Sequence, residues 1–122
     1  MPDVLGVCKL FMYAGVTLEQ YARLLSAFTG WDLKCKNLLQ IGERTNNLQR
    51  LFNIREGFTR KDDDLPDRAM KRPSFGAYQK EDRCIVKDYE GMLKEYYHER
   101  GWDTETGIPT KEKLSELGLK KK

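Results

Sequence analysis

Histidine occurs only once in this sequence of 122 residues, and cysteine only three times. Cys8, Cys35 and Cys84 lie far apart and form no C-x-x-C pair, which argues against a disulfide framework and a zinc site. Cys35 and Cys84 are therefore interpreted as buried or half-buried thiols. The single histidine, His98, has no companion ligand at helical spacing, so we predict that it is exposed and binds no metal.

Long apolar runs are absent too. No stretch approaches the roughly 20 apolar residues that span a bilayer. Asp3 and Lys9 interrupt the first apolar segment, so no signal peptide is expected either. The formal charge is only +3, and most Lys and Arg stand near Asp or Glu, except in the terminal run 120–122. A nucleic-acid-binding protein usually gathers its basic residues in a patch. The sequence thus suggests a soluble cytoplasmic protein with neither a nucleic-acid nor a membrane partner.

Residues 37–57 contain the longest apolar seam of the chain. Its side chains recur at gaps of three and four, the spacing of one helical face; they are Leu38, Ile41, Thr45, Leu48 and Phe52. Gly57 can supply a left-handed residue where the helix ends. We therefore predict a long central helix against which shorter helices pack.

Shorter helices are predicted within 17–30, 88–101 and 110–119. Each of these begins at a Thr or Asp that can cap the first turn, and each ends near a glycine. In the first, the expected apolar stripe consists of Leu18, Tyr21, Leu24, Leu25 and Phe28. In the second, the side expected to face inward carries Tyr89, Met92, Leu93, Tyr96 and Arg100.

These patterns predict an all-α fold, an irregular bundle of five or six helices around the long central one, with no significant sheet. The length favours a single domain over 1–119, and the basic tail 120–122 is expected to be frayed.

Residues 3–14 are apolar on nearly every side of a helical wheel. Such a segment has to be enclosed on several sides, although it lies near a chain terminus, where most domains fray. One interpretation is that another polypeptide covers it, or a second copy bound through residues 4–13. The alternative is a core helix enclosed by the chain's own elements.

Arg60–Asp64 is a mixed charge run, which we interpret as a solvated loop because its adjacent carboxylates lack the spacing of a calcium site. The chain has no G-x-S-x-G elbow and no metal-binding histidine pair. The residues alone therefore indicate a helical domain that lacks a partner, and no catalytic residue is assigned.

Asp3-Val-Leu-Gly-Val-Cys8 resembles the D-x-x-G-L-C motif of the tungsten-dependent aldehyde ferredoxin oxidoreductases. Further blocks resemble the same family in the same order; they are Gly42–Arg44, Asn47–Gly57, Asp64–Arg68, Met92–Leu93, Tyr96–Tyr97, Arg100–Asp103 and Ile108–Leu119. The resemblance covers nearly the whole chain and corresponds to the C-terminal helical portion of that enzyme.

In that family a tungsten held by two pterin dithiolenes oxidises an aldehyde to its carboxylate, and a [4Fe-4S] cluster passes electrons to ferredoxin. The resemblance implies that Cys8 is the fourth cluster ligand, the other three lying in an upstream cysteine-rich stretch. It also implies that Asp3 and the backbone near Gly6 and Val7 contact one pterin. Iron binds thiolate, and pterin N–H groups need an oxygen acceptor, so these residue types suit those roles. Val7 replaces the family's leucine.

The family's other cofactor-binding domains have no counterpart in this chain, so we expect it to be a separately encoded or truncated piece. It is expected to bind neither cofactor alone and to be inactive by itself. Its expected partners are the upstream portion of the enzyme and, for the assembled enzyme, ferredoxin. Two alternatives remain: an interaction module that kept the fold without the redox role, and an inactive remnant.

Overall fold

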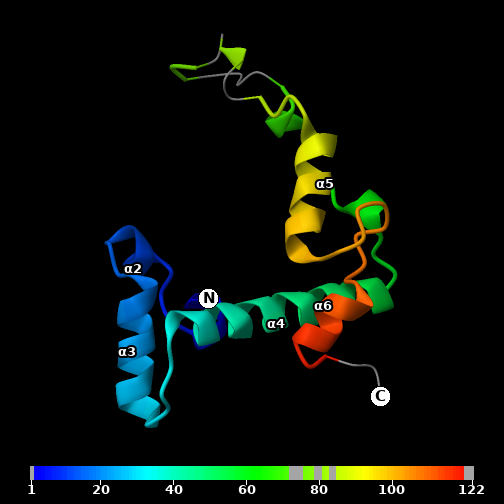
Figure 1. The fold of residues 1–122 in the computed structure, drawn as a ribbon. Helices are drawn as coiled ribbons and strands as arrows, with labels where there is room; N and C mark the ends of the chain where they lie inside the picture. The colour runs from blue at the N-terminus through cyan, green and yellow to red at the C-terminus, as the bar shows by residue number, and fades with distance from the viewer. Residues whose placement is uncertain (1, 72–75, 79–80, 83–84, 120–122) are drawn as a thin grey trace. The chain divides into compact units, whose positions relative to one another are not determined.

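The computed structural model describes residues 2–71, 76–78, 81–82 and 85–119, which form helices joined by turns (Figure 1). Within these ranges there is no β-strand, only one isolated bridge between Trp102 and Pro109. The α-helices are α1 (Pro2–Leu5), α2 (Leu10–Tyr13), α3 (Leu18–Thr29), α4 (Cys35–Arg55), α5 (Tyr89–Arg100) and α6 (Lys111–Glu116). The 3-10 helices η1 (Arg60–Asp62) and η2 (Asp67–Ala69) lie in the described part of the chain between α4 and α5. The predicted all-α class and the long central helix are confirmed.

The helix ends form as their sequences predict. Thr17 accepts a hydrogen bond from the Gln20 amide at 3.3 Å, and the Gln20 side chain accepts one from the Thr17 amide at 2.8 Å. This reciprocal pair satisfies two amides that the first turn leaves without partners. Gly30 and Gly57 adopt φ values of +74° and +95° at the ends of α3 and α4, a conformation that costs other residues energy.

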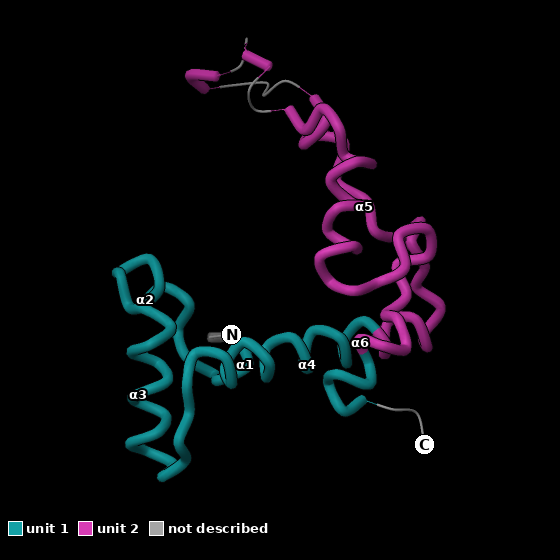
Figure 2. The backbone as a smooth tube through the Cα atoms, in the orientation of Figure 1, with its two compact units in different colours: residues 1–50, 114–122 teal, residues 51–113 magenta. Residues whose placement is uncertain are grey.

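The chain divides into two compact units, residues 1–50 with 114–122, and residues 51–113 (Figure 2). The single domain predicted over 1–119 stays a prediction. The tail 120–122 lies outside the described residues.

The core of the first unit joins α3 to the start of α4. Tyr21, Ala22 and Leu38 are buried, and partly buried apolar side chains surround them; these are Leu5, Val7, Val16, Leu18, Leu25, Leu33 and Ile41. The predicted stripe of α3 is therefore covered only along one edge. Leu24 and Phe28 belong to the same stripe but are 65% and 91% exposed.

The buried side of α4 changes along the helix. Leu38 is fully buried as the seam predicts, but Leu48 and Phe52 are 49% and 54% exposed. Asn47 and Arg50 are buried instead. At about 3.6 residues per turn, Asn47 projects from the side opposite Leu38. The prediction that the whole seam is packed is wrong at Leu48 and Phe52, because the buried side of the helix changes from Leu38 to Asn47 and Arg50.

The core of the second unit is aromatic. Tyr97 and Trp102 are buried with Leu93, and Tyr89 packs against them. The Trp102 ring lies 5.8 Å from the Tyr97 ring, and the Trp102 amide donates to the Tyr97 carbonyl at 2.8 Å across the left-handed Gly101. The glycine end of α5 was predicted. Of the predicted inward side, Leu93 is buried and Tyr89 is half-buried, but Tyr96 is 41% exposed. Met92 is 58% exposed, so the buried side is turned toward Leu93 and Tyr97.

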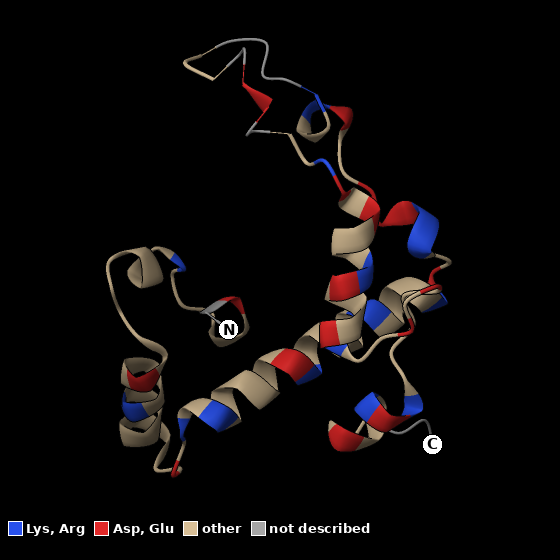
Figure 3. Ribbon diagram, turned by 45° about the horizontal axis from the view of Figure 1, so that its top comes forward, with Lys and Arg blue, Asp and Glu red and all other residues tan. Residues whose placement is uncertain are grey.

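Basic and acidic residues alternate along the ribbon rather than separating by sign (Figure 3). Among the described helices, none combines the length and the apolar character needed to cross a membrane.

Candidate functional site

The motif residues Asp3, Gly6, Val7 and Cys8 lie in α1 and in the turn that joins it to α2. The Gly6 amide donates to the Asp3 carbonyl at 3.3 Å, which closes α1, and Gly6 has a φ of +65°. The Cys8 carbonyl then accepts from the Phe11 amide at 3.2 Å, at the start of α2. Backbone hydrogen bonds therefore fix the chain on both sides of the Gly6–Cys8 turn.

Side chains of this turn alternate between the core and the surface. Leu5 and Val7 pack against the buried cluster of Tyr21, Ala22 and Leu38. Gly6 and Cys8, which alternate with them, are exposed. The apolar pair anchors the turn, and the Cys8 thiol is thereby presented outward where a ligand or another polypeptide can reach it.

Asp3 is also exposed, on α1. Apart from Gly6 and its two chain neighbours, no described residue has an atom within 4 Å of the position that a Gly6 side chain would occupy. Glycine at this position therefore reflects the left-handed backbone, which costs other residues about 1–2 kcal/mol, and it leaves the backbone open to a flat ligand.

Apart from Leu5 and Val7, the described elements leave the apolar segment 3–14 largely exposed. It forms two four-residue helices instead of one core helix, and α2 has no buried residue. The interpretation of this segment as a core helix of the chain itself is therefore wrong.

The other candidate ligands lie as the sequence analysis predicts, as far as they are described. Cys35 is half-buried, and His98 is exposed with Nδ1 3.6 Å from Glu99. Cys84 lies outside the described residues. In the part of the chain that the structure describes, no three His, Cys, Asp or Glu side chains gather as a metal site would require. Cys8 is therefore a single thiol, whereas a cubane cluster takes four.

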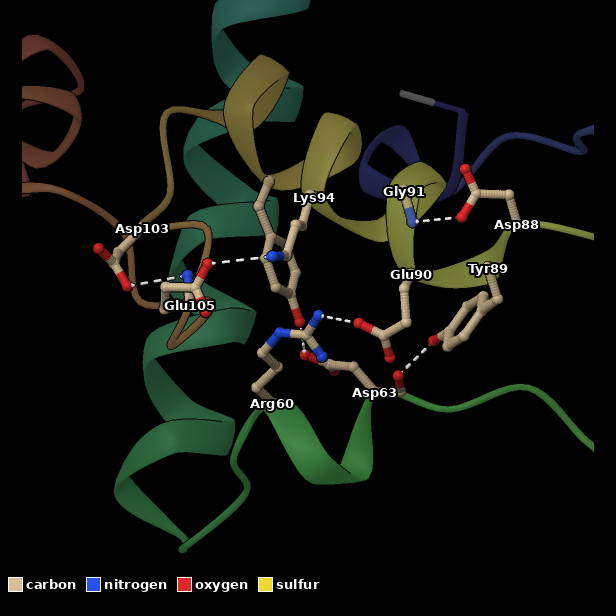
Figure 4. A network of polar contacts seen from close by, with 10 residues as sticks. Arg60, Asp63, Asp88, Tyr89, Glu90, Gly91, Lys94, Asp103 and Glu105 are labelled. Atoms are coloured by element: carbon tan, nitrogen blue, oxygen red, sulfur yellow. Dashed lines mark hydrogen bonds and ion pairs between the residues drawn. The ribbon is translucent and has the colours of Figure 1, made fainter.

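A polar network in the second unit was missed by the sequence analysis (Figure 4). Asp63 is half-buried; its carboxylate accepts from the Tyr97 hydroxyl, and its carbonyl accepts from the Tyr89 hydroxyl. Burial, with a smaller effect of the Asp64 and Asp63 charges, raises the pKa of Tyr89 above its ordinary value. The interpretation of Arg60–Asp64 as a solvated loop is thus wrong for Asp63, since two distant tyrosines of α5 reach it.

Two ion pairs continue this network. Arg60 pairs with Glu90, and Lys94 lies 3.3 Å from Glu105. These four residues line a cavity of about 740 Å³ whose apolar wall includes Ile54, Phe58 and Ile108. Because each of these cations already has a carboxylate partner, the network tethers η1 and the 103–108 turn to α5. We assign it a structural role.

The turn after α5 gives a pH-dependent prediction. Asp103 accepts hydrogen bonds from the Thr106 hydroxyl at 2.6 Å and from the Thr106 and Glu105 amides at 2.8 and 3.2 Å. The Thr106 hydroxyl and then its amide lower the pKa of Asp103 below its ordinary value of 3.8. The folded state thus gains stability from the Asp103 charge above the unfolded pKa, and loses it as the pH falls through the folded pKa.

Replacing Thr106 by valine removes the hydroxyl and keeps the side-chain shape. The pKa of Asp103 is then expected to rise toward its ordinary value, while the backbone amides keep part of the shift. An NMR titration of the Asp103 carboxyl measures this change, and Thr104→Val is the matched control. A pKa that stays unchanged in Thr106→Val would show that the hydroxyl does not stabilise the carboxylate.

Comparison with known proteins identifies the family of this chain. The family described as "Aldehyde ferredoxin oxidoreductase, domains 2 & 3" matches residues 1–119. Since the match covers nearly the whole sequence, the chain belongs to the aldehyde ferredoxin oxidoreductase family.

Curated relatives include proteins with the family's name. A tungsten-containing aldehyde ferredoxin oxidoreductase of Pyrococcus furiosus is 42% identical over 118 residues, which are 96% of this chain and 19% of the relative. The Thermococcus kodakarensis enzyme is 39% identical over the same share. An aliphatic sulfonate oxidoreductase WOR-like subunit of Pyrococcus furiosus is 35% identical. The chain therefore spans about a fifth of the length of these relatives.

A solved structure has a similar fold. It is the active site complex BamBC of benzoyl coenzyme A reductase, with a TM-score of 0.65 and 30% identity. The similarity covers 85% of this chain and 14% of that one.

Proposed function

We propose that this chain is the C-terminal part of a tungsten-containing aldehyde ferredoxin oxidoreductase, in which Cys8 is one thiolate ligand of a [4Fe-4S] cluster. The observation that carries the proposal is the exposed Cys8 on a turn that Leu5 and Val7 anchor to the core. A ligand to a cluster shared with other polypeptide has to be accessible and held in place, and this turn meets both conditions.

The residues of the turn suit the two cofactors. The Cys8 thiol supplies the sulfur ligand that iron–sulfur clusters use. The exposed Asp3 carboxylate can accept hydrogen bonds from pterin N–H groups. The Val7 side chain packs against the core, so only the Val7 backbone is left to contact the pterin. The family has leucine at this position, and valine would therefore change the core packing rather than the pterin contact.

The chain's own contribution is to bind and orient. When bound, the tungstopterin supplies the oxidation of an aldehyde to a carboxylate, and the cluster carries the electrons onward to ferredoxin. Three of the four cluster thiolates would come from the upstream portion of the enzyme. No residue of this chain is assigned a catalytic role, and activity is proposed for the assembled protein alone.

A second candidate is a helical interaction module or an inactive remnant, and the exposed apolar side chains of α2 favour the former. Such a chain would bind another polypeptide without taking part in redox chemistry.

A graft into the Pyrococcus furiosus relative separates these functions. Residues 1–119 replace the matched region of that enzyme, and the purified chimera is analysed for iron and tungsten and by electron paramagnetic resonance. We expect about four iron atoms per chimera and the spectrum of a reduced [4Fe-4S] cluster, together with bound tungsten. A folded chimera without iron and tungsten would contradict the proposed function and favour the remnant.

A further inference from the structure

We propose that the cavity beside η1 in the second unit binds a small organic monocarboxylate that carries an aliphatic or aromatic group. The cavity has a volume of about 740 Å³, and small-molecule sites usually measure about 300–1,000 Å³. Its lining residues lie between Ile54 and Ile108, so they all belong to the unit of residues 51–113. The walls of the site therefore come from one compact unit.

The apolar wall of the cavity is accessible to a ligand. Ile54 is half-buried, while Phe58 and Ile108 are 55% and 45% exposed. The Phe58 amide donates to the Asn53 carbonyl at 3.0 Å across the left-handed Gly57, which fixes the backbone of this wall. A hydrocarbon group bound here would be removed from water together with these side chains, which is favourable.

The Arg60 guanidinium is fixed before any ligand binds. The Arg60 side chain is 20% exposed, and its Nη2 atom donates to Glu90 (Figure 4). The guanidinium carbon also lies 5.8 Å from the centre of the Tyr97 ring. A guanidinium has five N–H donors, so donors remain for a ligand while the pair with Glu90 persists. Because these donors are already oriented, little conformational entropy is lost when a carboxylate binds.

Lys61 supplies a second cation to the same cavity. Among the described residues its ammonium has no ion-pair partner. A carboxylate placed between Lys61 and Arg60 would gain charge-assisted hydrogen bonds from both.

The balance of charge around the cavity selects a ligand with one negative charge. The lining contains three cations, Arg60, Lys61 and Lys94, and two carboxylates, Glu90 and Glu105, so its net charge is 3 − 2 = +1. A single carboxylate neutralises this excess, whereas the two lining carboxylates would repel a dianion such as a phosphate ester. The apolar wall and the charge together therefore indicate a monocarboxylate with a hydrocarbon group.

The test is an NMR titration of the full 122-residue chain with phenylacetate, which joins one carboxylate to a phenyl ring. We expect saturable binding with a dissociation constant of about 1 mM or lower. The amide signals that shift should belong to residues 54–61 and 105–108. Acetate, which lacks the ring, and phenylacetamide, which lacks the charge, should each bind about tenfold more weakly or worse.

Lys61→Gln and Phe58→Ala test the two parts of the site. Each should raise the dissociation constant of phenylacetate about threefold or more. The matched controls are Lys111→Gln and Phe52→Ala, because Lys111 is exposed, Phe52 is 54% exposed, and neither lines the cavity. Both controls should bind phenylacetate as the unchanged chain does, and circular dichroism checks that each variant is folded.

Several results would overturn the assignment. They are no saturable binding of phenylacetate, equal binding of phenylacetamide, and tighter binding of phenyl phosphate, which would mean that the site prefers a dianion. Equal effects of Lys61→Gln and Lys111→Gln would also overturn it, because binding would then not depend on the cavity. None of these measurements needs iron or tungsten, so their failure would not bear on the role proposed for Cys8.

Discussion

Cys8→Ser in the grafted enzyme is expected to abolish the spectrum of the reduced [4Fe-4S] cluster. A cubane needs four thiolates, and the serine hydroxyl is a poor substitute for a soft sulfur ligand. The iron content should fall clearly below about four atoms per chimera. Tungsten should stay near its level in the parent graft, because the proposed pterin contacts belong to Asp3, Gly6 and Val7.

Cys35→Ser is the control for this experiment. Cys35 is half-buried at the start of α4, so its replacement should leave the cluster spectrum unchanged. Loss of tungsten together with iron in Cys8→Ser would indicate a folding defect rather than loss of a ligand. An unchanged cluster spectrum in Cys8→Ser would remove the proposed role of Cys8.

Leu38→Ala is expected to lower the free energy of unfolding of the chain by about 3 kcal/mol. Leu38 is fully buried and forms one cluster with Tyr21 and Ala22. Its truncation removes apolar contacts and leaves a cavity that the surrounding helices fill only in part. Because Leu5 and Val7 pack on the same cluster, the loss should also loosen the turn that presents Cys8.

Leu39→Ala is the adjacent control, since Leu39 is 57% exposed on the same helix. Its cost should stay within about 1 kcal/mol. Urea denaturation followed by circular dichroism compares the two variants. Equal losses of stability would contradict the assignment of Leu38 to the core.

Local signals in the sequence predicted the helix ends. Thr17 with Gln20, Gly30, Asp88 and Gly101 all take the predicted roles, and Asp88 accepts from the Gly91 amide at 2.9 Å. These features depend on residues within one turn of each other. These capping interactions can therefore be predicted without knowing the tertiary structure.

Burial could not be predicted in the same way. The α4 seam is covered at Leu38 and exposed at Leu48, and Asn47 is buried on the opposite side. Asp63 accepts from Tyr97, 34 residues away. Contacts of this kind depend on which distant elements meet. An apolar periodicity identifies a helix face that could be buried, but it does not show which element packs against that face.

The sequence by itself indicated the all-α class through its helical periodicity and capping residues, and it indicated the family and the candidate ligand through the Asp3–Cys8 motif and the ordered blocks after it. Only the tertiary structure decided that Leu5 and Val7 face the core while Cys8 and α2 face outward. The physical reason is that ligand chemistry belongs to the residue type, whereas exposure is set by the packing around Tyr21, Ala22 and Leu38.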